Sequence, residues 1–167
     1  MERNAVYAGT FDPPTYGHLW LIEKAASLFD ILHVVVSDNA EKAYTYSLDV
    51  RVKMLKIITS HLRNVSIEVF ASGFLADYAI DIGADYLVRG MRTVKDYEYE
   101  RIIRQINADI APSLLSVFLM PPREYAEISS SLVRGLVGFN RWEEVIKPYV
   151  PEPIRELMVE EFYKHEH

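Results

Sequence analysis

The stretch AVYAGTFDPPTYGH, residues 5–18, predicts a strand, then a loop, then the start of a helix. Its apolar beginning is typical of a buried strand, and the two adjacent prolines exclude a helix directly after it. Helical spacing of apolar residues begins at Gly17. Such a loop leaves backbone N–H groups and a helix N-terminus facing the end of the strand, where they stabilise anions. We therefore expect a phosphate-binding site here.

Outward from this stretch, runs rich in Val and Ile alternate with helical patterns. This alternation predicts an α/β fold, a single-domain, Rossmann-like, doubly wound sheet of about five parallel strands with helices on both faces. The predicted strands are Asn4–Ala8, Ile31–Ser37, Val65–Phe70, Tyr86–Arg89 and Leu115–Phe118. The predicted helices are Gly17–Phe29, Leu48–Leu62 with Ser47 as N-cap, Leu75–Ile82 ended by Gly83, Val94–Ile110, a short helix after residues 128–131, and Pro151–Tyr163. We expect one domain over residues 1–167, with a core of 4–137 and a helical C-terminal extension of 138–167.

The composition excludes several classes of protein. A net charge of −6 argues against nucleic acid as a partner, because its binders need a basic surface. The sequence has no signal-peptide pattern and no apolar segment of membrane-spanning length, so we expect no membrane partner and a cytoplasmic location. Cysteine is absent, and so are the G-x-x-x-x-G-K-[ST], G-x-S-x-G and HExxH motifs. Thiol, kinase and hydrolase chemistry are therefore disfavoured.

The unusual side chains follow the predicted strands. Because the carboxyl ends of parallel strands share one edge of the sheet, ligands of such folds bind there, near the point where the strand order reverses. That edge is predicted to collect residues 9–18, 38–42, 73–75, 89–92 and 120–131. We expect these segments to line one anion-binding cleft.

Within these segments, three groups suit phosphate. His18 in a first helical turn can donate to a phosphate oxygen, and its context outweighs the alternative of a capping histidine. Arg89 and Arg92 flank Gly90-Met91 and resemble a phosphate clamp. Two solvated arginines on a loop fit the same pattern equally well. The serines at 129–131 offer three hydroxyls at a helix start, which suits a triphosphate. An N-cap alone would account for only one of the three. Lys42 can supply a mobile charge. The remaining histidines, His33, His61, His165 and His167, are expected to be solvated or structural.

Taken together, the motifs G-T-F-D-P with T-x-G-H at 9–18, R-G-x-R at 89–92 and I-S-S-S-x-x-R at 128–134 are similar to those of the nucleotidylyltransferase superfamily. From Ala5 to about Val133 the chain resembles the bacterial phosphopantetheine adenylyltransferase family, including the segments 29–30, 83–85, 96–100 and 118–121. The resemblance implies transfer of the adenylyl group of ATP to 4′-phosphopantetheine, giving 3′-dephospho-CoA and pyrophosphate, the penultimate step of coenzyme A biosynthesis. It also implies direct in-line attack without a covalent enzyme intermediate, Mg²⁺ as cofactor, dephospho-CoA or CoA as product or inhibitor, and a homo-hexamer.

The resemblance also implies residue roles. His18 is predicted to stabilise the transition state, with Thr10, Lys42 and Arg92 as the other catalytic residues. The predicted acceptor-binding residues are Thr10, Lys42, Leu75 and Arg89. The predicted ATP-binding residues are Thr10, Phe11, His18, Gly90, Met91, Arg92, Glu100, Tyr125, Ala126, Glu127, Ile128, Ser129, Ser130 and Ser131. We expect no metal ligands from the protein. From charge patterning alone, the acids at 96–100 fit a solvated face equally well.

The chain departs from the family pattern after Lys42. Ala43-Tyr44 stands where a second lysine and a proline are common, so this loop is expected to bind its ligand differently. Ala8 replaces a common proline, and Glu127 a usually apolar or aromatic residue. Three alternatives stay open: a related enzyme acting on another phosphate, such as nicotinate mononucleotide or glycerol 3-phosphate, a non-catalytic nucleotide sensor, and a protein–protein interaction module.

Overall fold

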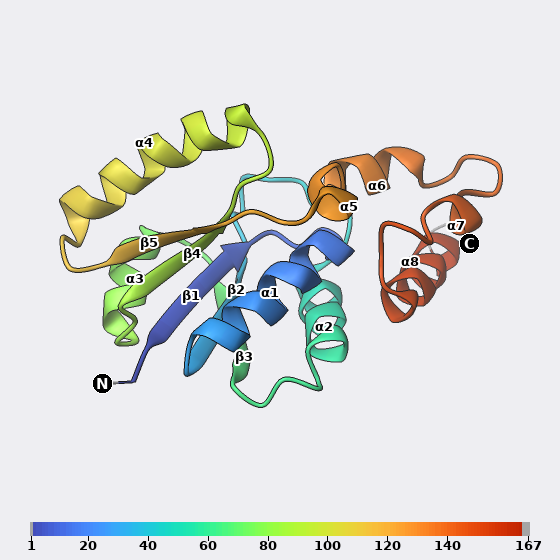
Figure 1. The fold of residues 1–167 in the computed structure, drawn as a ribbon. Coiled ribbons are helices and arrows are strands. Elements are labelled where there is room, and N and C mark those ends of the chain that lie inside the picture. Colours follow the sequence, from blue (N-terminus) through green and yellow to red (C-terminus); the bar gives the residue numbers. More distant parts are fainter. Residues whose placement is uncertain (1, 165–167) are drawn as a thin grey trace.

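Five parallel strands form the centre of the computed structural model, which describes residues 2–164 (Figure 1). Their order across the sheet is β3-β2-β1-β4-β5, and the strands are β1 (Asn4–Gly9), β2 (Ile31–Ser37), β3 (Val65–Phe70), β4 (Tyr86–Gly90) and β5 (Leu115–Leu119). All neighbouring strands pair in parallel, with Tyr7 of β1 opposite Val34 of β2 and Val88 of β4. The five predicted strands are confirmed. The order reverses at β1, so the switch point lies between β1 and β4.

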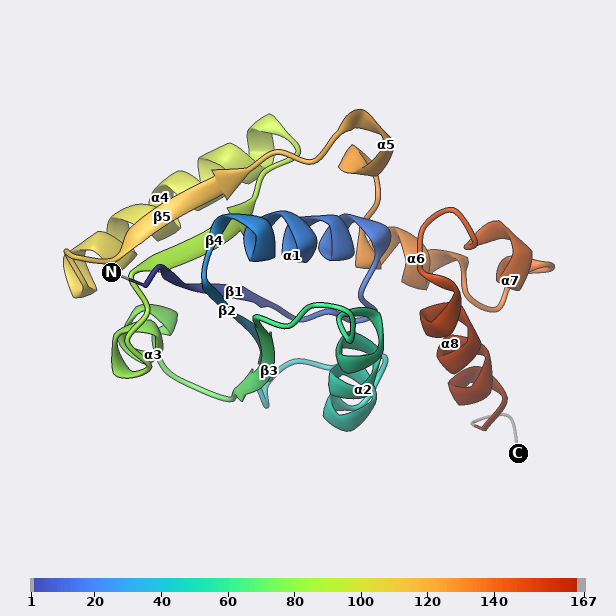
Figure 2. The same ribbon diagram turned by 60° about the horizontal axis from the view of Figure 1, so that its bottom comes forward.

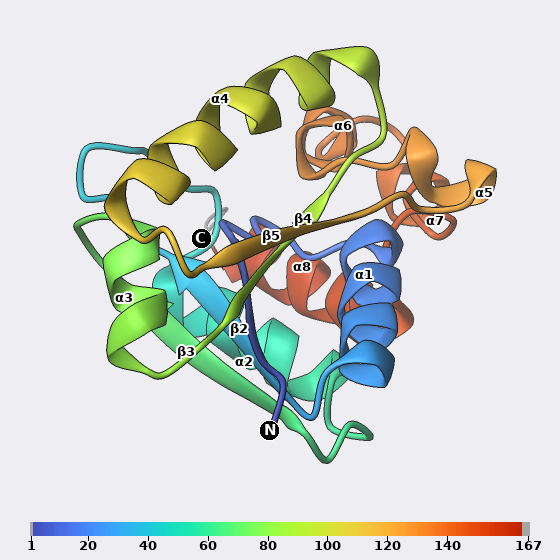
Figure 3. The same ribbon diagram turned by 60° about the vertical axis from the view of Figure 1, so that its left-hand side comes forward.

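Helices cover both faces of the sheet (Figures 2 and 3). On one face lie α1 (Tyr16–Leu28) and α2 (Leu48–Ile58), and on the other α3 (Leu75–Asp81) and α4 (Val94–Ile110). Alternate side chains of a strand point to opposite faces. Accordingly, Val34 and Val36 join the core cluster that contains α1 and α2, whereas Val35 joins the one that contains α3. The doubly wound α/β architecture is confirmed.

The ends of α2 and α3 follow from their capping residues. The Ser47 hydroxyl accepts from the backbone N–H of Val50, as the predicted N-cap requires. At its other end α2 is shorter than predicted, because the hydroxyls of Thr59 and Ser60 donate back to carbonyls of the preceding turn and compete with further helix. Gly83 adopts the left-handed conformation, with φ of 72°, as predicted after α3.

Between β5 and residue 164 the chain forms four helices, α5 (Arg123–Ala126), α6 (Ser130–Leu136), α7 (Trp142–Val145) and α8 (Glu152–Lys164). The one-turn helices α5 and α7 were not predicted, since four residues are too short for a periodic pattern. Trp142, Ile154 and Met158 are buried in the same cluster as α2. The C-terminal extension therefore shares the main core, and its boundary at residue 138 stays a prediction. Within residues 2–164, no helix has the length and apolarity needed to cross a bilayer.

Candidate functional site

A cavity of about 260 Å³ opens where the strand order reverses, at the carboxyl ends of β1 and β4. The structure brings six of the predicted site residues to its wall, namely Thr10, His18, Arg89, Gly90, Arg92 and Glu100. Gly9, Gly17 and Pro121 also line it and belong to the segments predicted to line the cleft, whereas Tyr7, Ala8 and Leu21 lie outside those segments. The cavity thus gathers groups from β1, α1, β4 and α4, as expected for a switch-point site.

His18 is held in one orientation by the N-cap of its own helix. The backbone N–H of Thr15 donates to His18 Nδ1 over 3.1 Å, and the Thr15 hydroxyl lies 3.0 Å from the same nitrogen. An imidazole whose Nδ1 accepts carries its proton on Nε2 when neutral. Burial and then the charge of Arg92 lower the pKa of His18 to about 4. At neutral pH the residue therefore offers the cavity an uncharged Nε2–H donor.

Arg89 and Glu100 form a two-point ion pair at the cavity wall. Arg89 Nε donates to Glu100 Oε2 over 2.8 Å, and Nη2 donates to Oε1 over 2.6 Å. Burial would lower the pKa of Arg89, but the hydrogen bonds and charge of Glu100 outweigh it and raise that pKa. A guanidinium has five N–H donors. Glu100 therefore fixes the plane of the group and leaves the other N–H donors for an anion.

Arg92 links the start of α4 to the segment that follows β5. Its Nη1 donates to the carbonyl of Ile128 over 2.7 Å, and its Nε lies 3.6 Å from Asp96 Oδ2. The same segment approaches α1, because a Cβ added to Gly17 would lie 3.6 Å from the Tyr125 carbonyl oxygen. Tyr125 also stacks on Tyr16, with ring centroids 6.4 Å apart. Residues 125–128 thus lie beside the cavity although they are absent from its wall.

The three serines of the same segment all have partners within the protein. The Ser129 hydroxyl caps α6, the Ser130 hydroxyl donates to the carbonyl of Pro13 over 2.7 Å, and the Ser131 hydroxyl accepts from Arg134 over 3.1 Å. The sequence interpretation had given a structural task to one of them. Contact of these serines with ATP stays a prediction. Their backbone N–H groups would donate to phosphate oxygens, and the free lone pairs of their hydroxyls would accept.

Two residues predicted to contact ATP, Phe11 and Met91, are already engaged within the fold. The Phe11 side chain is fully buried and packs edge-on against Tyr7 and His18, so a ligand can reach this residue through its backbone. The Met91 N–H donates to the Leu119 carbonyl and continues the pairing of β4 with β5. The remaining predicted contacts have mixed exposure, with Ala126 half-buried, Ile128 buried and Glu127 exposed.

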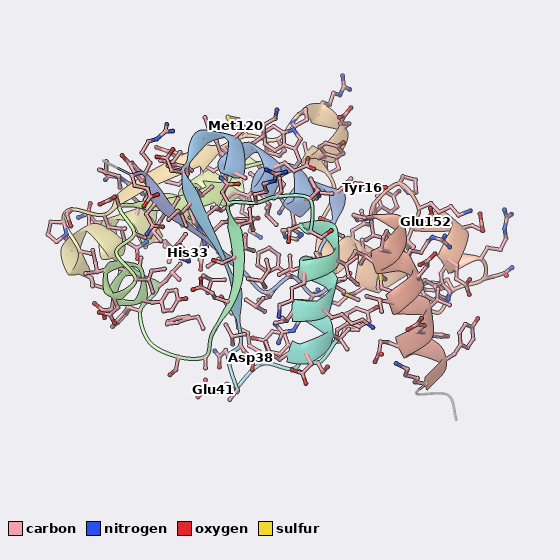
Figure 4. The ribbon with its side chains drawn as sticks, turned by 90° about the horizontal axis from the view of Figure 1, so that it is seen from below. Tyr16, His33, Asp38, Glu41, Met120 and Glu152 are labelled. Atoms are coloured by element: carbon pink, nitrogen blue, oxygen red, sulfur yellow. The ribbon has the colours of Figure 1, made fainter. Side chains whose placement is uncertain are left out.

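Lys42 and Leu75 lie away from this cavity. Lys42 is exposed in the loop after β2, and Leu75 is half-buried at the first residue of α3. At the carboxyl ends of β2 and β3, a second hollow is lined by Ser37, Asp38, Asn39 and residues 70–73. Figure 4 shows Asp38 beside α2 and Glu41 farther out on the same loop. Of the predicted acceptor-binding residues, Thr10 and Arg89 therefore line the cavity, whereas Lys42 and Leu75 line neither of these two hollows.

Two buried charged residues organise the loops around the cavity and were missed by sequence reasoning. The Asp12 carboxylate accepts from the backbone N–H groups of Thr45 and Tyr46, each over 2.9 Å. Arg51 is fully buried and donates to the carbonyl of Thr10 over 3.0 Å. A signal for Arg51 exists, because it stands three and four residues before Met54 and Leu55, on the apolar stripe of α2.

The other histidines have structural surroundings. His33 pairs with Glu68 in a network that also includes Ser66 and Tyr78, and His61 lies 3.0 Å from Glu23. His165 and His167 lie outside the described residues. Among residues 2–164, no group of three or more His, Cys, Asp or Glu side chains is arranged to hold a metal ion.

Comparisons with known proteins agree with this geometry. Residues 6–136 match the model of the cytidylyltransferase-like family. A phosphopantetheine adenylyltransferase of Chromobacterium violaceum is 51% identical over 157 residues, covering 94% of this chain and 96% of that protein. One from Neisseria meningitidis serogroup C is 51% identical over 164 residues, covering 98% and 96%. A structure of Plasmodium falciparum nicotinic acid mononucleotide adenylyltransferase complexed with NaAD has a TM-score of 0.68 over 96% of both chains at 18% identity, which shows a shared fold.

Proposed function

Because this chain belongs to the phosphopantetheine adenylyltransferase family of cytidylyltransferase-like proteins, we propose that it transfers the adenylyl group of ATP to 4′-phosphopantetheine. The products are 3′-dephospho-CoA and pyrophosphate, and the reaction is the penultimate step of coenzyme A biosynthesis. The observation that carries the proposal is the switch-point cavity, where His18, Arg89 and Arg92 meet.

The cavity residues suit an in-line displacement. A phosphate monoester has a second pKa of about 6, so the acceptor arrives largely as a dianion and needs no general base. The task left to the protein is to align two anions and to stabilise charge on the α-phosphate and the departing pyrophosphate. In this proposal the Nε2–H of His18 donates to the α-phosphate, and Arg89 and Arg92 hold phosphate oxygens beside it. No covalent enzyme intermediate is required.

We propose Mg²⁺ as the cofactor, carried by the triphosphate. The carboxylate at the cavity wall, Glu100, is already paired with Arg89, which fits an ion that takes its ligands from phosphate oxygens and water. When bound, Mg²⁺ neutralises part of the triphosphate charge. The residues of the chain orient the phosphates and supply hydrogen-bond donors.

The test is a reaction of purified protein with ATP, Mg²⁺ and 4′-phosphopantetheine, read by mass for dephospho-CoA and pyrophosphate. Parallel reactions contain nicotinate mononucleotide or glycerol 3-phosphate as the acceptor. We expect dephospho-CoA, and at most a hundredth of that rate with the other two acceptors. Faster adenylylation of another acceptor, or ATP binding without any product, contradicts the proposal.

We further propose a cytoplasmic homo-hexamer. The apolar side chains that α4 exposes support self-association, since Val94 is 77% and Ile102 56% exposed in the single chain. Light scattering coupled to size exclusion tests the hexamer, and a monomeric mass would contradict it. Fractionation of cells that express the protein tests the location.

A further inference from the structure

The buried Arg51 guanidinium connects three separate parts of the chain. Its Nη1 donates to the carbonyls of Thr10 over 3.0 Å and of Ser37 over 3.1 Å, and its Nε donates to the carbonyl of Tyr46 over 3.1 Å. Its Nη2 is paired with the carboxylate of Asp38. A buried guanidinium is stable only when its donors are satisfied, and these contacts engage the group on both edges.

The contacts of Arg51 join the cavity wall to the loop that carries Lys42. Thr10 follows β1 and lines the cavity, whereas Ser37 and Tyr46 lie at the two ends of the loop 38–46. Figure 4 shows Asp38 at the point where this loop passes α2. The planar guanidinium of this one side chain therefore ties the Thr10 turn to both ends of the loop.

Tyr44 completes the arrangement from the solvent side. Its ring lies over the Arg51 guanidinium, with the carbon Cζ of Arg51 4.0 Å from the ring centroid. Its hydroxyl accepts from the backbone N–H of Asn39 over 2.8 Å. Position 44, where proline is common in the family, thus holds a tyrosine. Its ring covers the Arg51 guanidinium, and its hydroxyl links two residues of the same loop. A stacked aromatic ring stabilises a cation most when water is excluded from it.

We propose that Arg51 is a positioning residue, held by Tyr44, that fixes the loop 38–46 and with it Lys42 relative to Thr10, so that the acceptor phosphate meets a preformed site. This inference rests on the proposed function, and neither Arg51 nor Tyr44 is among the residues predicted to bind a substrate. Among the groups predicted to bind ATP, the hydrogen bonds of Arg51 reach the carbonyl of Thr10, which is also predicted to bind the acceptor. Within residues 2–164 they reach none of the predicted ATP-binding groups on β4, α4 or residues 125–131, whereas they hold both ends of the loop that carries Lys42. Arg51 should therefore act on the acceptor more than on ATP.

The test compares KM for 4′-phosphopantetheine with Kd for ATP in wild type, Arg51→Lys, Tyr44→Ala and Tyr44→Phe. Lysine keeps the charge but cannot reach four oxygens in a fixed plane. We expect Arg51→Lys to raise the acceptor KM about tenfold and Tyr44→Ala at least threefold, each with less than a twofold change in Kd for ATP. Tyr44→Phe keeps the ring over Arg51 and loses only the hydrogen bond from Asn39, so its acceptor KM should rise less than that of Tyr44→Ala. Lys56→Arg, on the exposed side of the same helix, is the matched control.

The outcomes separate positioning from mere stability. A variant that is only less stable loses kcat in proportion to its unfolded fraction and keeps its KM. An acceptor KM within threefold of wild type in Arg51→Lys, or an equal rise in Kd for ATP, would overturn the inference. If Arg51→Lys fails to fold, Tyr44→Ala decides by the same criteria. Absence of product with the wild-type protein would overturn the proposed function and this inference with it, whereas wild-type turnover with unaltered variants would overturn this inference alone.

Discussion

The ion pair between Arg89 and Glu100 gives a quantitative prediction for the substitution Glu100→Gln. The Glu100 side chain is 9% exposed and that of Arg89 is 22% exposed, so the pair is largely withdrawn from water. Removing one partner of a fully buried pair costs about 3–5 kcal/mol. Here the glutamine oxygen keeps one contact and solvent reaches part of Arg89, so we expect about 2 kcal/mol, close to one charge-assisted hydrogen bond. For a chain of this size, that corresponds to a fall in Tm of about 4–8 °C.

The assay is a double-mutant cycle of Glu100→Gln and Arg89→Gln, measured by urea unfolding at one fixed protein concentration. Each single variant leaves a polar group without its partner, and the double variant removes both charges. The double variant should therefore be more stable than the sum of the single effects predicts, with a coupling energy of at least about 1 kcal/mol. The control is Glu144→Gln, which breaks an exposed ion pair with Lys147 and should leave Tm unchanged. A coupling energy below about 0.5 kcal/mol would show that the two side chains are independent and refute the reasoning.

Three further predictions concern the loop and the helix that follow β1. His18→Ala should keep Kd for ATP within a few fold and lower kcat by about two orders of magnitude or more, as loss of a transition-state donor does, and an unchanged kcat would remove His18 from the mechanism. The His18 ring should titrate by NMR near pH 4, below the ordinary value of about 6.5. Because the folded-state pKa of His18 is lowered, the stability that its neutral ring contributes is full above about pH 6.5 and is lost as the pH falls toward 4. Titration of the ring near pH 6.5 would contradict a buried, neutral His18. Asp12→Asn turns an amide NH₂ toward the N–H of Thr45 or Tyr46 and should cost about 2 kcal/mol by urea unfolding, whereas the exposed Asp49→Asn serves as its control.

Local patterns were enough to predict the sheet and much of the cavity. The strands are short runs of Val and Ile bounded by turn residues, and their carboxyl ends necessarily share an edge once the order is parallel. Thr10, His18 and Arg92 are each the first unusual residue after a strand or at a helix start, so their convergence follows from the topology. Their roles toward ATP and the acceptor stay predictions.

Partners that are distant in sequence were beyond such patterns. The pairing of Arg89 with Glu100 depends on how α4 crosses the end of β4, and charge patterning alone left the acids of α4 open between a solvated face and a ligand site. The serines at 129–131 show the opposite difficulty, because a motif that fits phosphate also fits caps and loop anchors. The early end of α2 has a simpler cause, since two hydroxyl side chains compete for helix carbonyls.

The loop at residues 10–13 explains why the sequence can reveal an anion site without revealing its support. Its carbonyls are bound by Arg51 at Thr10, by Arg134 at Asp12 and by Ser130 at Pro13, from donors 41, 122 and 117 positions away in sequence. The C=O of a trans peptide points opposite to the next N–H. Binding of the Thr10 carbonyl to Arg51 therefore turns the Phe11 N–H away from α2. Distant donors thus occupy the acceptors of the loop, and the loop presents an excess of donors to an anion. A glycine and two prolines make such a loop possible, but only the folded positions of α2 and α6 fix its polarity.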